Sequence, residues 1–404
     1  MRRRRGAGRV DRPRRRTAGG VGPAGHGPDA GHDAAVGRTQ AAGGGASAGR
    51  SDRVYDVFKG ILILVIVAGH NEAIAHRWPA LRQVFYYFNV QCFFMLSFVL
   101  DRKPFSAALL RDRAVRYLVP YGVFMALAAA AFLPLRGFPD GFGAWARSFA
   151  AALYDGREAS IHEAVGMRVF WFLPTLFSLV MLRAVWTGFP RCRIPLLVAA
   201  LAWMGGAAAV PPDTVRWWPL GMASALFFLA PCLAVRWLHD RMSPANRGWY
   251  AGVATAVACL CGWAVVAVPL GWVAGANPAG YDPARPVTFA VGLVFPAAMF
   301  FALMAASRAL ETSRLLQACG RQSLGIFLVH MFVYRALTLA VFGRRFTSPE
   351  TVGPHLAIGL AVFAATVFLS LAAAAALPRW PRLSALIVPR DWAGWRAAIT
   401  GRAA

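Results

Sequence analysis

A lysine and a histidine stand in a mainly apolar segment near the start of the chain, "YDVFKGILILVIVAGHN", residues 55–71. Lys59 and His70 are eleven residues apart, and at ~100° per helical residue this spacing returns to the same helix face after about three turns. The helical rise places them ~16 Å apart along that face. A neutral imidazole can take a proton from a hydroxyl or carry a transferred group, so His70 is a candidate catalytic residue.

Asp56 lies three residues before Lys59, so the two side chains can form an i,i+3 ion pair on the same face. Simpler explanations exist, because a lysine can extend its ammonium group to the cytoplasmic membrane surface and His70 can cap the outer helix end. A charged residue inside a membrane span costs at least ~2.5–3.5 kcal/mol on insertion scales. We therefore expect the polar stripe to face the interior of a helix bundle.

A second polar group lies in "GRQSLGIFLVHMFVYRAL", residues 320–337. Ser323 precedes His330 by seven residues, which is two helical turns and the same face. The serine hydroxyl could instead form a hydrogen bond between helices. Arg335, farther along the same span, keeps its charge and therefore requires a partner or water.

Two arginines, Arg113 and Arg116, lie three residues apart in "RDRAVRYLVPY", residues 111–121. This spacing puts both guanidinium groups on one side of a helix, and two such planar donors suit a phosphate group. The alternative is that they anchor the helix at the cytoplasmic membrane surface, as basic residues commonly do.

The composition indicates that the helices carrying these residues cross a membrane. Of 404 residues, 58% are hydrophobic and only 15% are charged, and the mean hydropathy is +0.49. Apolar segments of roughly 17–24 residues, the length needed to cross a bilayer, recur along the chain. We predict an all-α polytopic bundle of about ten transmembrane helices, at about 57–75, 84–100, 115–134, 169–187, 194–211, 217–239, 249–272, 287–306, 322–342 and 354–377.

The basic residues predict the topology. The net charge of +25 comes largely from clusters between apolar segments, which is typical of membrane topology and argues against nucleic-acid binding. The distribution favours a cell-membrane protein with both termini in the cytoplasm. The inner connections expected to carry the excess of Lys and Arg are 101–116, 183–193, 236–247 and 308–321.

Three parts of the chain are expected. Residues 1–52 form a basic tail rich in Arg, Gly and Ala, which we interpret as disordered, and residues 53–380 form the membrane domain. Residues 381–404 form a cytoplasmic C-terminal tail. Two long outer connections, 135–168 and 273–286, could shape a substrate entrance.

Taken together, these motifs resemble those of the integral-membrane acyltransferase family 3, in particular its fucose-acetylase-like and exopolysaccharide O-acetyltransferase branch. The resemblance covers roughly residues 53–340. The family motif of a basic residue, ten residues and a histidine is similar to Lys59 to His70, and its paired arginines are similar to Arg113 and Arg116.

Further segments support the resemblance. "FWFLPTLFSLV", which contains Trp171, is similar to the family's Trp-Phe-Leu segment, and "GRQSLGIFLVH" is similar to its late Ser-Leu segment with a histidine. One departure concerns "FFMLSFVL", where Ser97 is followed by Phe98 although the family usually has glycine there. The bulk of Phe98 is expected to narrow the neighbouring cavity.

The resemblance implies transfer of an acyl group, usually acetyl, from cytoplasmic acyl-CoA to a sugar hydroxyl. It implies that His70 is catalytic, that Lys59 lies in the same tunnel, and that Arg113 and Arg116 hold the phosphates of coenzyme A. Acetyl-CoA is the expected donor substrate, with no metal and no permanently bound cofactor. The expected partners are acyl-CoA, a sugar or glycan acceptor and membrane lipids. The remaining residues expected to line the tunnel are Asp56, Ser97, Trp171, Ser323, His330 and Arg335.

Two other classes of function are compatible with the same residues. A transporter or flippase of acylated sugars would use them to line a path and would need no acyl-CoA. A membrane scaffold would use them as contacts between helices. The sequence also leaves open whether His70 acts as a general base or as an acyl carrier, which acceptor is used, and how long the acyl chain is. In the loop 135–168, His162 or Glu163 could orient the acceptor, although both could simply be solvated.

Overall fold

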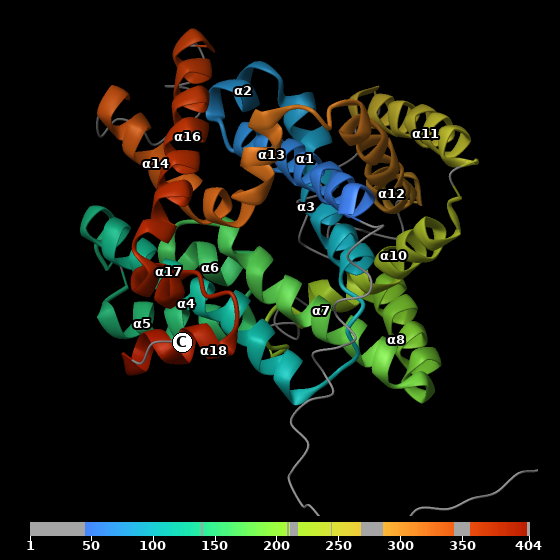
Figure 1. Cartoon of the computed structure of the whole chain (residues 1–404). Helices are drawn as coiled ribbons and strands as arrows, with labels where there is room; N and C mark the ends of the chain where they lie inside the picture. The colour runs from blue at the N-terminus through green and yellow to red at the C-terminus, as the bar shows by residue number, and fades with distance from the viewer. Residues whose placement is uncertain are drawn as a thin grey trace, which may run out of the picture. The chain divides into compact units, whose positions relative to one another are not determined.

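The computed structural model describes residues 45–401 apart from 139, 208–209, 211–216, 244, 268–285 and 343–355, and all its regular elements are helical. The expected all-α architecture is confirmed (Figure 1). Most of the expected tail 1–52 and nearly all of the connection 273–286 lie outside the described residues. The compact unit that contains the membrane helices spans Arg50–Ala404.

The first half of the chain contains the elements that carry most of the polar motifs. They are α1 (Gly45–Gly69), α2 (Glu72–Arg77), α3 (Pro79–Leu100), α4 (Ala107–Arg136), α5 (Phe142–Asp155), α6 (Glu158–Val165), the 3₁₀ turn η1 (Val169–Trp171), α7 (Phe172–Gly188), η2 (Pro190–Cys192) and α8 (Arg193–Gly206). The second half contains α10 (Met222–Arg241), α11 (Arg247–Ala267), α12 (Pro286–Ala309), α13 (Arg314–Arg321), α14 (Ser323–Phe342), α16 (Leu356–Ala376), η6 (Leu377–Arg379), α17 (Pro381–Ile387) and α18 (Trp392–Thr400).

Eight segments in the described residues are long and apolar enough to cross a membrane, and each coincides with a predicted span. The other two predicted spans also form helices, α1 and α8. Helix α8 has only 14 residues. The N-terminal half of α1 carries Asp52, Arg53, Asp56 and Lys59, which makes this part of the helix unusually polar. The chain is therefore an all-helical, multi-pass membrane protein.

The first predicted span, 57–75, is not one continuous helix. Helix α1 ends at Gly69, and Asn71 begins α2 by accepting a hydrogen bond from the Ile74 N–H at 3.1 Å. The Asn71 amide also donates to the Gly359 carbonyl of α16 at 2.9 Å. Because an asparagine side chain satisfies the free N–H groups of a helix start, the chain breaks beside His70 and leaves its imidazole at the helix end.

Helices α1 and α13 cross with their backbones in close contact. A Cβ atom at Gly60 would collide with the Leu316 carbonyl, and one at Gly320 would collide with the Asp56 carbonyl. The absence of side chains at both glycines allows this approach, as small residues do between membrane helices. The crossing fixes the segment of α1 that carries Asp56 and Lys59.

The connection 135–168 contains two helices, α5 and α6, which pack against each other. Helix α7 follows them and is the most enclosed of the spanning helices, with 83% of its most apolar window buried. At the C-terminal end, α18 packs against α4, and the Trp392 N–H donates to the Asp112 carboxylate at 3.1 Å. The C-terminal segment thus forms two helices, α17 and α18, and α18 packs near the N-terminal end of α4.

Candidate active site

Two cavities lie among the helices that carry the polar motifs. The first, which we call the histidine cavity, has a volume of about 260 Å³ and contains His70. The second, which we call the arginine cavity, has a volume of about 420 Å³ and contains Lys59, Arg113 and Arg116. The sequence-predicted residues are therefore divided between two neighbouring spaces.

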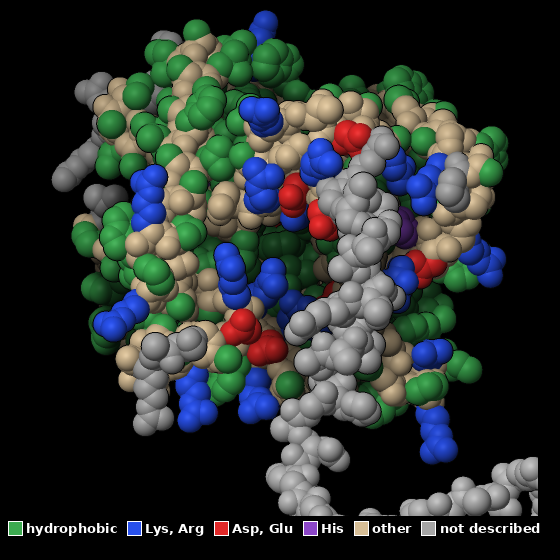
Figure 2. All heavy atoms as spheres, viewed as in Figure 1, with side chains coloured by type: hydrophobic (Ala, Val, Ile, Leu, Met, Phe, Trp, Pro, Cys, Tyr) green, Lys and Arg blue, Asp and Glu red, His purple; other side chains and the backbone are tan. Residues whose placement is uncertain are grey.

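The arginine cavity has a basic rim and an apolar interior. Lys59, Lys103, Arg113 and Arg116 line it together with many aliphatic and aromatic side chains. Figure 2 looks onto a hollow with hydrophobic side chains inside and with Lys and Arg side chains, together with a few Asp and Glu side chains, around it. Such a site can hold a molecule that is anionic at one end and apolar at the other.

Two serines expected in the tunnel also line the arginine cavity. The Ser97 hydroxyl donates to the Phe94 carbonyl at 2.7 Å, one turn back in α3. Ser323 is the first residue of α14. The neighbouring Phe98 is fully buried and is not among the residues that line either cavity. Its expected effect on the size of the cavity stays a prediction.

Arg113 is held by an acidic residue that the sequence analysis did not identify. Its guanidinium donates to the Asp101 carboxylate at 2.8 Å. The other carboxylate oxygen of Asp101 lies 3.1 Å from Arg183, whose side chain is fully buried in α7. Arg183 also donates to the carbonyls of Asp101 and Lys103. Asp101 thus joins two arginines and fixes the connection between α3 and α4.

A single stripe of α1 passes both cavities. Lys59 and Ile63 line the arginine cavity, Ile66 lines both cavities, and His70 lines the histidine cavity. The Lys59 ammonium lies 2.8 Å from Asp56 as an i,i+3 ion pair, although Asp56 lines neither cavity. The expected face shared by Lys59 and His70 therefore exists, and it faces the bundle interior.

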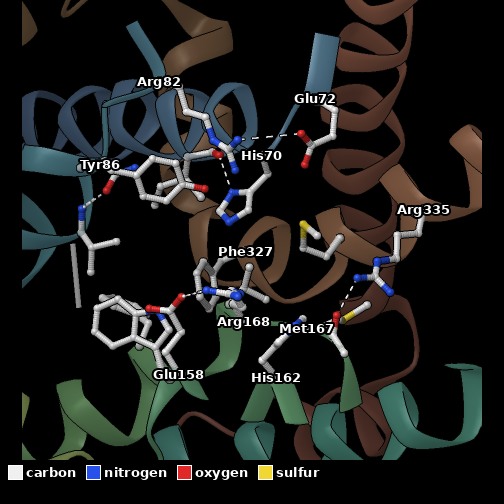
Figure 3. Close-up of a pocket in the computed structure, with 18 residues that line it drawn as sticks. His70, Glu72, Arg82, Tyr86, Glu158, His162, Met167, Arg168, Phe327 and Arg335 are labelled. Atoms are coloured by element: carbon white, nitrogen blue, oxygen red, sulfur yellow. Dashed lines mark hydrogen bonds and ion pairs between the residues drawn. The ribbon is translucent and has the colours of Figure 1, made fainter. Parts of the chain in front are cut away.

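The His70 imidazole projects into the histidine cavity (Figure 3). Its Nδ1 lies 2.7 Å from the Ile66 carbonyl oxygen. A carbonyl oxygen can only accept, so this contact requires a hydrogen on Nδ1 and leaves Nε2 of the neutral ring as an acceptor. The end of α1 therefore supplies both the position and the tautomer of the ring.

His330 packs against His70 but is not among the residues that line either cavity. It is 0% exposed, and the ring centroids lie 5.3 Å apart in an edge-to-face arrangement. Its Nδ1 contacts the Phe327 carbonyl at 2.7 Å, and within the described part of the chain its Nε2 has no hydrogen-bond partner. The sequence predicted both histidines as site residues, but only the tertiary structure brings the rings together.

Paired charges surround His70 in the histidine cavity. Arg82 lies 3.9 Å from Glu72, and Arg168 lies 3.2 Å from Glu158. These four side chains line the cavity and were not identified from the sequence (Figure 3). Glu72 and Glu158 are the first residues of the short helices α2 and α6, a position that favours carboxylates. Burial raises the pKa of Glu158, and the neighbouring Arg168 opposes this shift.

Arg335 obtains its expected partner from the connection before α7. Its guanidinium donates to the Gly166 carbonyl at 2.6 Å and it lines the histidine cavity (Figure 3). Trp171 lines the same cavity. Of the two residues considered as acceptor contacts, His162 lines it, whereas Glu163 accepts a hydrogen bond from Ser148 at 2.7 Å and does not.

Three apolar residues, Ile66, Phe172 and Phe327, line both cavities. They come from α1, α7 and α14 and are almost completely buried. The two cavities therefore meet at a wall of one aliphatic and two aromatic side chains. Lys59, Arg113 and Arg116 lie on one side of this wall, and His70 lies on the other.

The fold and cavities define a multi-pass membrane protein with a histidine site next to a basic, partly apolar cavity. The model of the acyltransferase domain of family 3 matches residues 53–375, so the chain belongs to this membrane acyltransferase family. Comparisons with curated proteins and with solved structures gave no match. Within the described residues, no group of three or more His, Cys, Asp or Glu side chains is arranged to hold a metal ion.

Proposed function

We propose that this protein is an O-acyltransferase of the cell membrane, which moves an acetyl group from cytoplasmic acetyl-CoA to a hydroxyl of a sugar or cell-surface glycan. The observation that carries the proposal is the common wall between a basic cavity and the cavity that contains His70. The family supplies the reaction class, and the two cavities offer separate places for donor and acceptor.

The donor is assigned to the arginine cavity. Coenzyme A carries phosphates at one end and a flexible pantetheine arm at the other, which matches a basic rim and an apolar interior. Arg113 and Arg116 bind the phosphates, and Lys59 lies deeper on the path toward His70. Both termini and the loop 101–116 are then cytoplasmic, as the distribution of Lys and Arg favours.

His70 acts as the general base in this proposal. Its Nε2 takes the proton of the acceptor hydroxyl while the oxygen attacks the thioester carbonyl carbon. The carbon–sulfur bond breaks, an ester forms, and the departing thiolate of coenzyme A receives the proton from Nε2. The Ile66 carbonyl holds the Nδ1 hydrogen throughout, at 2.7 Å, so the ring keeps its orientation.

The acceptor is assigned to the histidine cavity. Carboxylates and guanidinium groups from Glu72, Arg82, Glu158 and Arg168 can form hydrogen bonds with sugar hydroxyls, and the ring of Trp171 offers an apolar surface for the sugar ring. The connection 135–168 contributes α6 to this cavity, which supports an acceptor entrance on the side that the proposed topology makes the outer one.

The proposal is tested by mass spectrometry of ester-linked acyl groups on surface glycans from cells with and without the protein. We expect an acetyl ester that disappears when the gene is deleted and returns with the intact protein. Membranes from the cells in which the intact protein has been restored should also release free CoA when they are supplied with acetyl-CoA. Unchanged glycan esters, or transport of an already acylated sugar without CoA release, would refute the acyltransferase assignment and favour a transporter.

A further inference from the structure

The wall between the cavities limits how the thioester of acyl-CoA can reach His70, and this inference rests on the proposed function. The phosphates of acyl-CoA are held in the arginine cavity, whereas the reacting hydroxyl lies beside His70 in the histidine cavity. The thioester carbonyl must therefore pass Ile66, Phe172 and Phe327. Because the acyl chain extends beyond the thioester, it enters the histidine cavity ahead of the carbonyl carbon.

The two aromatic rings of the wall are held by their neighbours. The centroids of Phe172 and Phe327 lie 5.0 Å apart. Phe172 stacks on the fully buried Phe94, with centroids 5.3 Å apart and an interplanar angle of 14°. Phe327 contacts the fully buried His330 at 5.9 Å. Because such interiors are densely packed, neither ring can withdraw without rearrangement of the side chains behind it.

The space beyond the wall is small. The histidine cavity measures about 260 Å³ and must hold the acyl group together with the acceptor. A longer acyl chain has no room to fold back beside the thioester, because the pantetheine arm must pass alongside Phe172 and Phe327, whose rings already contact each other and leave no space between them. Each additional methylene then competes with the acceptor for the same volume.

We infer that Ile66, Phe172 and Phe327 form a constriction that selects short acyl groups, with Phe327 and Phe172 as the specificity-determining residues. The constriction acts on the donor and touches the substrate without taking part in proton transfer. Replacing a ring by a smaller side chain opens space beside the thioester. The variant should then accept acyl groups that the native wall excludes.

The experiment uses inverted membrane vesicles from cells that express the full chain and contain the native acceptor. Acetyl-CoA, butyryl-CoA and hexanoyl-CoA are supplied separately, and both CoA release and ester-linked acyl groups on glycans are measured. The variants are Phe327→Ala, Phe172→Ala and the milder Phe327→Leu. Leu176→Ala is the matched control, because Leu176 also belongs to α7 but lines only the arginine cavity.

We expect the native protein to prefer acetyl-CoA over butyryl-CoA by at least about tenfold in kcat/KM, the size of effect that methylene groups produce in apolar pockets. Phe327→Ala and Phe172→Ala should reduce this preference about tenfold or more, and Phe327→Leu should reduce it less. Rates are normalised to membrane abundance. Because Phe→Ala in a packed core is strongly destabilising, Phe327→Leu provides the decisive comparison if the alanine variants do not accumulate.

The two levels of the proposal fail in different ways. If the native protein transfers no acyl group from any of the three donors, the proposed function itself is wrong. If acetyl transfer occurs but the native protein uses hexanoyl-CoA equally well, the constriction does not select chain length. The inference is also overturned if the ring variants keep the native preference, or if Leu176→Ala changes it as much as they do.

Discussion

The imidazole of His330 lies edge-on to that of His70, with 5.3 Å between the ring centroids. Each ring contacts a backbone carbonyl of the preceding helical turn through its Nδ1 atom. The distance is 2.7 Å from His70 to the Ile66 carbonyl and 2.7 Å from His330 to the Phe327 carbonyl. His330 is fully buried, whereas His70 is partly exposed and lines the cavity. The buried ring therefore forms a fixed surface against which the exposed ring is placed.

We expect His330→Ala to lower kcat without changing KM for the donor. A pair of aromatic rings contributes ~0.5–1.5 kcal/mol, which corresponds to about 2- to 13-fold in rate. His330→Phe keeps the ring contact and removes the nitrogen atoms, so this variant should retain most of the activity. Equal losses in the Ala and Phe variants, at equal abundance, would show that the histidine nitrogen atoms are needed and not the packing.

Replacing both Arg113 and Arg116 by Gln should raise KM for acetyl-CoA while KM for the acceptor stays nearly constant. Hydrogen bonds to charged groups contribute ~1.5–3 kcal/mol each, so an increase of tenfold or more is expected. Arg111→Gln is the matched control, because Arg111 is exposed on the same helix and lines neither cavity. An unchanged donor KM in the double variant at normal abundance would exclude these arginines from donor binding.

Asp101 and Arg183 should be energetically coupled. Asp101→Asn leaves the buried guanidinium of Arg183 without its counter-charge, and loss of one member of a buried pair costs about 3–5 kcal/mol. The double variant Asp101→Asn with Arg183→Gln should lose less thermal stability than the two single losses added together. The measurement is Tm of the purified protein in detergent. Strictly additive Tm losses would contradict the role of Asp101 as the residue that joins Arg113 and Arg183.

The raised pKa of Glu158 predicts a pH-dependent effect on stability. Burial disfavours the ionised carboxylate in the folded protein, so the native chain loses stability as pH rises from the ordinary glutamate pKa through the raised folded value. The Tm of Glu158→Gln relative to the native protein should therefore increase over this pH window and stay constant above it. Glu163→Gln is the control for removing a carboxylate from the same helix. A relative Tm of Glu158→Gln that falls with rising pH would contradict the expected sign.

Helical periodicity explains why part of the site could be predicted from the sequence. The i,i+3 pair of Asp56 with Lys59 and the face shared by Lys59 and His70 depend only on residue spacing within one helix. The predicted span 57–75 crosses the break after Gly69 because the apolar residues Ala73, Ile74 and Ala75 follow it, although Asn71 is a local signal for a helix start.

The remaining contacts depend on helices that are distant in the sequence. The pairing of Asp101 with Arg183 joins α7 to the connection before α4, and the contact of His70 with His330 joins α1 to α14. No spacing within a single segment predicts such contacts. A charged residue inside an apolar span, such as Arg183, was nevertheless a signal that a buried partner must exist.

The most direct test of the central claim is acetyl transfer by His70→Gln and His70→Ala in inverted membrane vesicles supplied with acetyl-CoA. Removal of a general base typically lowers the rate about 10²–10⁴-fold, and we expect a loss of this size in both variants at native membrane abundance. Binding of acetyl-CoA should persist, because the arginine cavity is intact. Transfer at the native rate by either well-expressed variant would contradict the assignment of His70 as the catalytic base.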